Sequence, residues 1–84
     1  MLQVLFFGRL REALDCERLE IAADLAGPDL DSLQSYLCAT YGDTWHAELG
    51  APNVIRALNQ QMVQGNSAIS DGDEIAFFPP VTGG

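Results

Sequence analysis

With 84 residues, of which 48% are hydrophobic, the chain is long enough for one small globular domain and too apolar to be disordered. Twelve acidic residues oppose four basic ones, all arginines, which gives a formal net charge of −8 at pH 7. This balance excludes nucleic-acid binding, which needs surplus cations, and the absence of lysine excludes a phosphate-binding loop.

No apolar run approaches the length of a membrane span, and the first residues carry no basic leader. These two features predict a cytoplasmic protein without a membrane partner. The only cysteines, Cys16 and Cys38, lack the spacing of a metal site or a disulfide framework. Both are expected to be small buried or half-buried hydrophobic residues.

The N-terminal part of the chain predicts two strands around a short helix. Residues 2–7 are strand-like, with Leu2, Val4 and Phe6 on one face and Gln3, Leu5 and Phe7 on the other. Gly8 ends this strand, and residues 9–14 suit a helix. Residues 18–22 alternate again and predict a second strand paired with the first. Residues 23–29 contain a Gly-Pro pair and are predicted to form a loop.

The main helix is predicted to start at Asp29, a favourable N-cap residue, and to end at Gly42. Its apolar stripe is predicted to face the core and consists of Leu30, Leu33, Leu37 and Tyr41. The later elements are a short irregular helix at 44–49, strands at 54–58, 61–64 and 74–78, a tight turn at 59–60 and a turn at 70–73. This order predicts a two-layer α+β fold with one domain over residues 1–84.

The C-terminal tail, residues 79–84, carries the strongest functional indication. Its two prolines predict a stiff, extended stalk, and Gly83 and Gly84 predict a slim, flexible tip that bears the α-carboxylate. Such a tail suits insertion into another protein's active site, with Gly84 as the reacting residue. The predicted insertion segment is Pro80, Val81, Thr82 and Gly83. A frayed chain end is the alternative.

No internal catalytic or metal site is predicted. His46, the only histidine, has no motif that supplies a nucleophile, and Asp71-Gly72-Asp73-Glu74 lacks the further ligands of a calcium loop. The carboxylates of Glu12, Asp15 and Glu17 are expected to be solvated. The residues therefore predict no catalytic set within the chain, and because it has no lysine, any ATP would have to be bound by a partner.

Two phenylalanines are predicted to face outward. If Ile75 and Phe77 point into the core, alternation places Phe78 on the other face of the sheet, and Phe7 has the outward parity of the first strand. An exposed apolar patch of this kind is typical of a protein contact. The predicted partner interface consists of Phe78, Phe7, Leu5 and Arg11. A loop or helix that covers these residues is the alternative.

The segment at 71–84, DGDEIAFFPPVTGG, closely resembles the C-terminus of the sulfur-carrier (small) subunits of molybdopterin synthase. Residues 4–12 and 57–60 are also similar to that family, so the resemblance covers essentially the whole chain. It implies a β-grasp, ubiquitin-like fold, with a mixed sheet of about five strands packed on one main helix.

The resemblance also implies a mechanism in which the chain is a non-catalytic sulfur-donor subunit of an enzyme complex. An adenylyltransferase similar to ubiquitin-activating enzymes would use ATP and Mg to adenylate Gly84, and a persulfide-bearing donor protein would convert it to a thiocarboxylate. The thiocarboxylate would give its sulfur to cyclic pyranopterin monophosphate inside the large subunit, forming the dithiolene of molybdopterin. The synthase would be a heterotetramer with a small subunit at each end of a large-subunit dimer. The chain alone would bind no cofactor.

Other functions share the diglycine end. The chain could carry sulfur for thiamine, cysteine or tRNA thiolation, in which case a different large partner would co-purify. It could also be a protein modifier joined through Gly84 to lysines of its targets, although without lysine it forms no isopeptide-linked chains on itself. In each case the acidic surface predicts basic partners.

Overall fold

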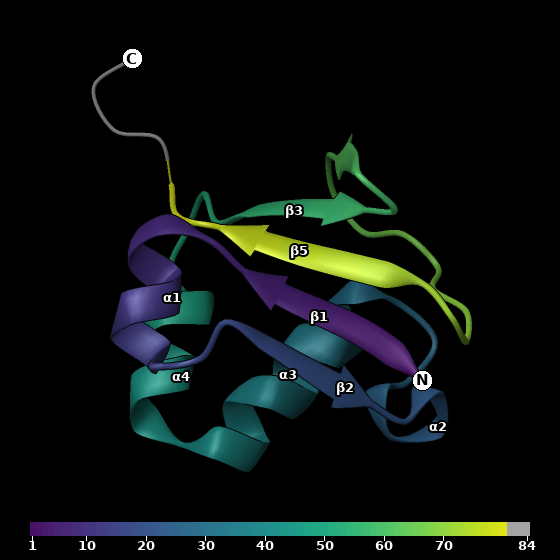
Figure 1. The fold of residues 1–84 in the computed structure, drawn as a ribbon, viewed down its shortest axis with the longest axis horizontal. Coiled ribbons are helices and arrows are strands. Elements are labelled where there is room, and N and C mark those ends of the chain that lie inside the picture. Colours follow the sequence, from purple (N-terminus) through teal and green to yellow (C-terminus); the bar gives the residue numbers. More distant parts are fainter. Residues whose placement is uncertain (81–84) are drawn as a thin grey trace.

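The structure, a computed structural model, describes residues 1–80, and residues 81–84 lie outside the described part. Within that part, five strands form one mixed sheet in the order β2-β1-β5-β3-β4 (Figure 1). The strands are β1 (Leu2–Phe6), β2 (Arg18–Ile21), β3 (Ile55–Leu58), β4 (Gln61–Val63) and β5 (Glu74–Phe78). Among these five strands, only β1 and β5 pair in parallel, which brings the end of the first strand beside the end of the last.

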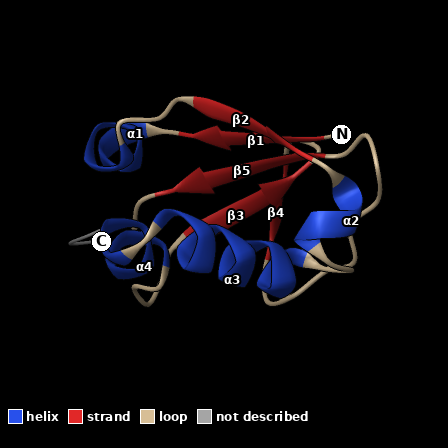
Figure 2. Cartoon of the chain, turned by 90° about the horizontal axis from the view of Figure 1, so that it is seen from below, coloured by secondary structure: helices blue, strands red, loops and turns tan. Residues whose placement is uncertain are grey.

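The helices are α1 (Gly8–Leu14), α2 (Ala23–Ala26), α3 (Leu30–Tyr41) and α4 (Asp43–Leu49). The longest, α3, runs along one face of the sheet and packs against both α2 and α4 (Figure 2). Asp29 begins α3 as predicted, because its carboxylate accepts a hydrogen bond from the Ser32 N–H at 2.8 Å. Gly42 ends the helix with a φ of +99°, a value that favours glycine. The arrangement is the α+β, β-grasp fold that the resemblance implies.

The core lies between the sheet and the helices. The fully buried large side chains come mainly from alternate positions of β1 and β5 and from one face of α3: Leu2, Val4, Phe6, Ile75, Phe77, Leu30, Leu33 and Leu37. The Phe6 ring meets Trp45 of α4 edge to face at 5.2 Å and stacks on Phe77 at 5.7 Å. Aromatic pairs of this kind add about 0.5–1.5 kcal/mol each beyond the burial of their area. These contacts join α4 to the centre of the sheet.

The predicted turn between β3 and β4 is confirmed. Asn59 and Gln60 have φ values of +50° and +69°, the positive values that a two-residue hairpin turn requires. The Asn59 side chain accepts a hydrogen bond from the Glu74 N–H at 3.0 Å and donates one to Asp73 Oδ1 at 3.1 Å. The hairpin is therefore tied to the start of β5.

Several local predictions are wrong. Residues 23–29 contain the helix α2, which the sequence pattern missed because four residues are too few to show helical periodicity. Tyr41 is 44% exposed and lies outside the core, because the last turn of α3 places its ring on Trp45, at 4.5 Å, and not on the sheet.

The segment predicted as an irregular helix at 44–49 is the regular helix α4, and it buries Trp45 and Leu49. Gly8 begins α1, and Phe7 is its N-cap residue and no longer part of β1. The boundaries of the other strands differ from the prediction by at most one residue. Among residues 1–80, no helix has both the length and the apolar character needed to span a membrane.

Candidate functional site

One face of the sheet carries the predicted outward residues. Ile75 and Phe77 are fully buried, so the alternate residues of β5, Ala76 and Phe78, face the side of the sheet away from α3. Strand pairing places Leu5 of β1 and Ala57 of β3 on either side of Ala76. Apolar side chains from three strands therefore meet in one row.

These residues line a shallow hollow of about 450 Å³. Its apolar members, which we call the open-face patch, are Leu5, Phe7, Ala57, Met62, Ala76 and Phe78. Met62 is 69% exposed and Phe7 is 41% exposed, although both are large and apolar. Exposed patches of this kind mark contacts with other proteins.

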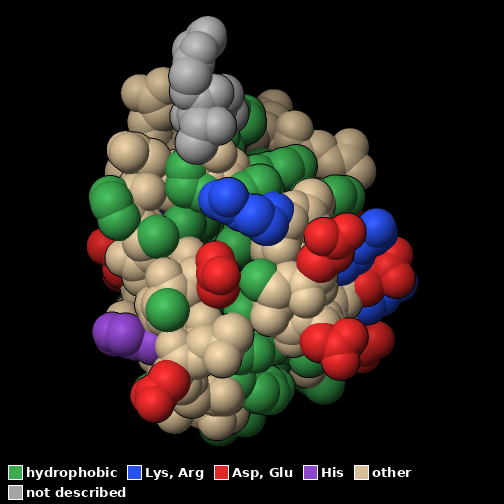
Figure 3. Space-filling view, turned by 90° about the vertical axis from the view of Figure 1, so that its left-hand side faces the viewer, with side chains coloured by type: hydrophobic (Ala, Val, Ile, Leu, Met, Phe, Trp, Pro, Cys, Tyr) green, Lys and Arg blue, Asp and Glu red, His purple; other side chains and the backbone are tan. Residues whose placement is uncertain are grey.

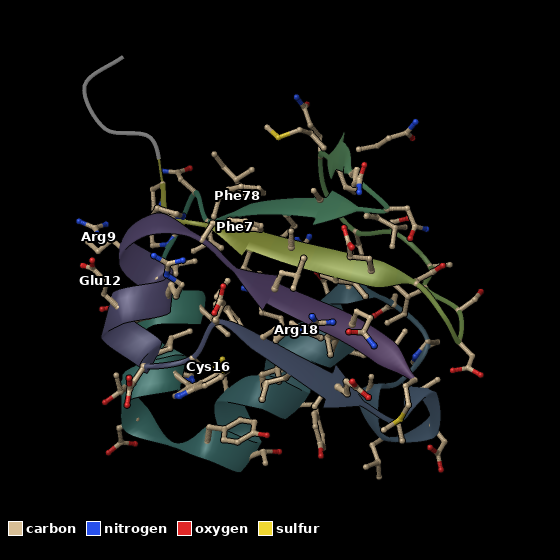
Figure 4. All side chains as sticks on the ribbon, in the orientation of Figure 1. Phe7, Arg9, Glu12, Cys16, Arg18 and Phe78 are labelled. Carbon is tan, nitrogen blue, oxygen red and sulfur yellow. The ribbon has the colours of Figure 1, made fainter. Side chains whose placement is uncertain are left out.

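A pair of aromatic rings closes the open-face patch at the end nearest the tail. The rings of Phe7 and Phe78 stack at 4.8 Å with planes 8° apart (Figure 4). Phe78 is the last residue of β5, and Pro79 and Pro80 follow it directly. The predicted residues Phe78, Phe7 and Leu5 are thus brought together, beside the start of the tail.

Polar side chains surround the apolar row. Gln60 and Glu74 line the same hollow, and on β2 Arg18 pairs in register with Leu5 and hydrogen-bonds to Gln3. An apolar centre with a charged rim is the usual anatomy of a protein interface. The end of the molecule from which the tail leaves also shows apolar side chains with basic and acidic groups among them (Figure 3).

Arg11, the fourth predicted interface residue, does not line the hollow. It lies on α1 with a side chain that is 54% exposed, and its Nη1 is 3.9 Å from Oε1 of Glu17. An exposed pair at this distance contributes little to stability. The Arg11 guanidinium therefore remains accessible to a partner that covers α1 together with the open-face patch.

The predicted reacting residue and most of the predicted insertion segment lie outside the described residues: Gly84, Gly83, Thr82 and Val81. Pro80 is the last described residue and is half-buried. The structure therefore places the root of the tail, at Pro79 and Pro80, next to the Phe7–Phe78 pair.

Other chemically capable side chains form no cluster in the described part. Cys16 and Cys38 are half-buried as predicted, and burial raises the pKa of both thiols, which leaves less of the reactive thiolate at neutral pH. Asp73 accepts hydrogen bonds from the Ser70 N–H and from Asn59, which confirms the predicted turn. Within residues 1–80 there is no group of three or more side chains placed to hold a metal ion.

Sequence reasoning missed the role of Arg56, which is 13% exposed and faces α3 from β3. Its guanidinium donates to Asp31 Oδ1 at 2.7 Å, to Gln34 Oε1 at 3.1 Å and to the Gly65 carbonyl at 2.5 Å. A charged side chain within an apolar strand needs partners of this kind when it is buried, so the position of Arg56 between apolar residues was the one signal in the sequence for such a role. These hydrogen bonds give Arg56 a structural role that ties β3 to α3.

Comparison with known proteins agrees with this geometry. Residues 4–84 match the ThiS family. The chain is 40% identical to proteins named molybdopterin synthase sulfur carrier subunit from Escherichia coli (strain K12) and Haemophilus influenzae, over 100% of this chain and 100% of each relative. A solved complex of subunits 1 and 2 of molybdopterin-converting factor from Helicobacter pylori 26695 contains a chain that is 30% identical, with a TM-score of 0.66 over 99% of this chain and 97% of that chain.

Proposed function

The chain belongs to the ThiS family, among the relatives of the molybdopterin synthase sulfur carrier subunits, and we propose that it carries sulfur for molybdopterin synthase as a thiocarboxylate on Gly84. The observation that carries this proposal is the match to those subunits over the full length of the chain. The open-face patch beside the root of the tail supports it, because a carrier must dock on partners while its end reaches into them.

The chemistry begins with activation of a poor electrophile. A partner that binds ATP and Mg joins the Gly84 carboxylate to AMP and releases pyrophosphate. The terminal sulfur of a partner's persulfide then attacks the acyl carbon and expels AMP, leaving an acyl disulfide. A second thiol attacks the partner's sulfur in that disulfide, so a new disulfide forms and the thiocarboxylate leaves on Gly84.

This chain contributes a reagent and its position, and the partners contribute catalysis. Its cations are four arginines, of which Arg56 is engaged with α3, so the phosphates of ATP and of a pterin monophosphate are bound by partner side chains. Delivery of the tail into a large-subunit active site supplies proximity and orientation for transfer of sulfur to cyclic pyranopterin monophosphate. Two successive transfers complete the dithiolene of molybdopterin.

The large subunit is the first partner that this function requires. The Helicobacter pylori complex holds two subunits together, and one of them is a relative of this chain. We extend the proposal to a heterotetramer with one such chain at each end of a large-subunit dimer, and to an activating enzyme that uses the same open-face patch. The cytoplasm, where ATP is available, is the location that fits this cycle.

The proposal is tested by reconstitution with the activating enzyme, ATP, Mg, a persulfide donor, the large subunit and the pterin substrate. The wild-type chain is expected to yield molybdopterin, and a variant without Gly84 is expected to yield none. Both should have nearly the same thermal midpoint, since removal of one terminal residue leaves the core unchanged. Molybdopterin formation by the shortened variant would end the proposal.

A further inference from the structure

The turn between β1 and α1 packs closely against the residue that begins the tail. Gly8 has a φ of +58°, and a Cβ atom on it would lie 3.3 Å from Cγ and 3.5 Å from Cδ of Pro79. The first distance is shorter than the optimal carbon–carbon contact of about 3.5–4.0 Å, so a side chain at residue 8 would displace Pro79 or the turn. The positive φ and the close approach each favour glycine at this position.

The preceding residue holds the two residues before Pro79. The Phe7 N–H donates to the Phe77 carbonyl at 3.1 Å, and the Phe7 ring stacks on Phe78 at 4.8 Å (Figure 4). The last register pair between β1 and β5 is Phe6 with Phe77, so the ring stack and the approach to Pro79 lie beyond the ladder. Phe7 and Gly8 thus hold three consecutive residues at the root of the tail.

We propose that the turn formed by Phe7 and Gly8 is a positioning element that fixes where the C-terminal tail leaves the domain relative to the open-face patch. Gly8 touches no reactant and acts through Pro79. Because proline fixes its own φ and restricts the residue before it, a displacement of Pro79 is passed on along the Pro79-Pro80 segment.

This inference rests on the proposed function, because the exit of the tail matters only if Gly84 is delivered to a partner's active site. Docking uses the open-face patch, whereas delivery of Gly84 uses the chain beyond Pro79. A shift of Pro79 should therefore change the rate of sulfur transfer without changing the affinity for the large subunit. A misplacement of about 1 Å lowers a rate by up to about a hundredfold. Because a Cβ on Gly8 requires Pro79 to move by only a few tenths of an ångström, we expect Gly8→Ala to slow single-turnover sulfur transfer by up to about tenfold, with little change in the Kd for the large subunit.

Gly65→Ala is the matched control. Gly65 also has a positive φ, of +84°, but within residues 1–80 no heavy atom other than those of its own chain neighbours lies within 4 Å of an added Cβ. Both variants therefore introduce backbone strain, and only Gly8→Ala meets the tail. Each chain is loaded as the thiocarboxylate and mixed with the large subunit and the pterin substrate, and the transfer rate, the Kd and the thermal midpoint are measured. Both midpoints should fall, while only Gly8→Ala should transfer slowly.

A second variant tests whether Gly8 acts through Pro79. Pro79→Ala removes the ring atoms that a Cβ at residue 8 would meet, and it should also slow transfer without weakening docking. If the two residues act through one contact, the double variant Gly8→Ala/Pro79→Ala transfers no more slowly than the slower single variant. A double variant whose loss of rate equals the product of the two single losses would show that Gly8 and Pro79 act independently, and would overturn the inference that they act through one contact.

A nuclear Overhauser effect between the Gly8 Hα atoms and the Pro79 ring protons gives a readout that is independent of activity. It should be present in the wild-type chain, and its absence would overturn the inference even if no sulfur were transferred. Equal transfer rates for Gly8→Ala and Gly65→Ala, or a loss of affinity as large as the loss of rate, would also overturn it. A wild-type chain that docks and shows this effect but transfers no sulfur would refute the proposed function and leave the positioning contact standing.

Discussion

Truncation of Phe78 separates docking from folding. The side chain is half-buried and stacks on Phe7 at 4.8 Å, whereas its neighbour Phe77 is fully buried. Loss of the aromatic pair costs about 0.5–1.5 kcal/mol beyond the apolar area that the half-buried ring covers, so Phe78→Ala should leave a folded domain of lower stability. Phe77→Ala should cost about 3–5 kcal/mol, a large part of the stability of a small domain.

Phe78→Ala should also weaken binding to the large subunit. Phe78 lies in the open-face patch beside the tail, the place for an aromatic anchor, and truncation of such an anchor costs about 1–3 kcal/mol of binding free energy. This corresponds to a Kd for the large subunit that is weaker by roughly 5- to 150-fold.

Titration calorimetry with the large subunit measures this loss, and circular dichroism melts measure the stability. Tyr41→Ala is the matched control, because Tyr41 is also an exposed, stacked aromatic residue but lies on α3, away from the open-face patch. It should lower the melting midpoint and leave the Kd unchanged. An unchanged Kd for Phe78→Ala would refute the docking role, and a collapsed fold would place Phe78 in the core.

Three further predictions concern charge, the thiols and the start of α3. With a net charge of −8, the association rate with the large subunit should fall as ionic strength rises toward physiological values, where the Debye length is about 8 Å, and the dissociation rate should change much less. If stopped-flow measurements show an association rate that does not depend on salt, the acidic surface serves solubility alone. The double variant Cys16→Ala/Cys38→Ala should still accept sulfur, because we propose Gly84 as the carrier and burial raises the pKa of both thiols. A loss of sulfur loading, seen by intact mass, would contradict this. Asp29→Ala should lower the melting midpoint at neutral pH, because it removes the N-cap of α3. The hydrogen bond from the Ser32 N–H lowers the pKa of Asp29 on folding, so the difference in melting midpoint between variant and wild type should shrink as pH falls below about 4. A difference in midpoint that stays constant down to low pH would count against the cap.

Local chemistry explains the parts of the fold that the sequence predicted. Asp29 and Gly42 bound α3 because a carboxylate caps free N–H groups and a glycine accepts positive φ, and both residues act on their immediate neighbours. The outward position of Phe78 follows from alternation along a strand whose other face is buried. These features need no knowledge of distant residues.

The order of the strands depends on residues far apart in the chain. The residues of β1 and β5 do not by themselves predict that the two strands pair in parallel. That pairing brings Phe7 beside Phe78 and Gly8 beside Pro79. The contact of Gly8 with Pro79 therefore had no sequence pattern of its own. The resemblance to the sulfur-carrier subunits of molybdopterin synthase predicted the β-grasp fold, which the local sequence patterns could not determine.

The central claim, that Gly84 carries the sulfur, is tested most directly by intact mass spectrometry after incubation with the activating enzyme, ATP, Mg and a persulfide donor. The claim predicts a mass gain equal to the replacement of one oxygen atom by one sulfur atom, confined to the C-terminal fragment and absent when ATP is omitted. An unchanged mass, or sulfur found on Cys16 or Cys38 instead, would contradict it.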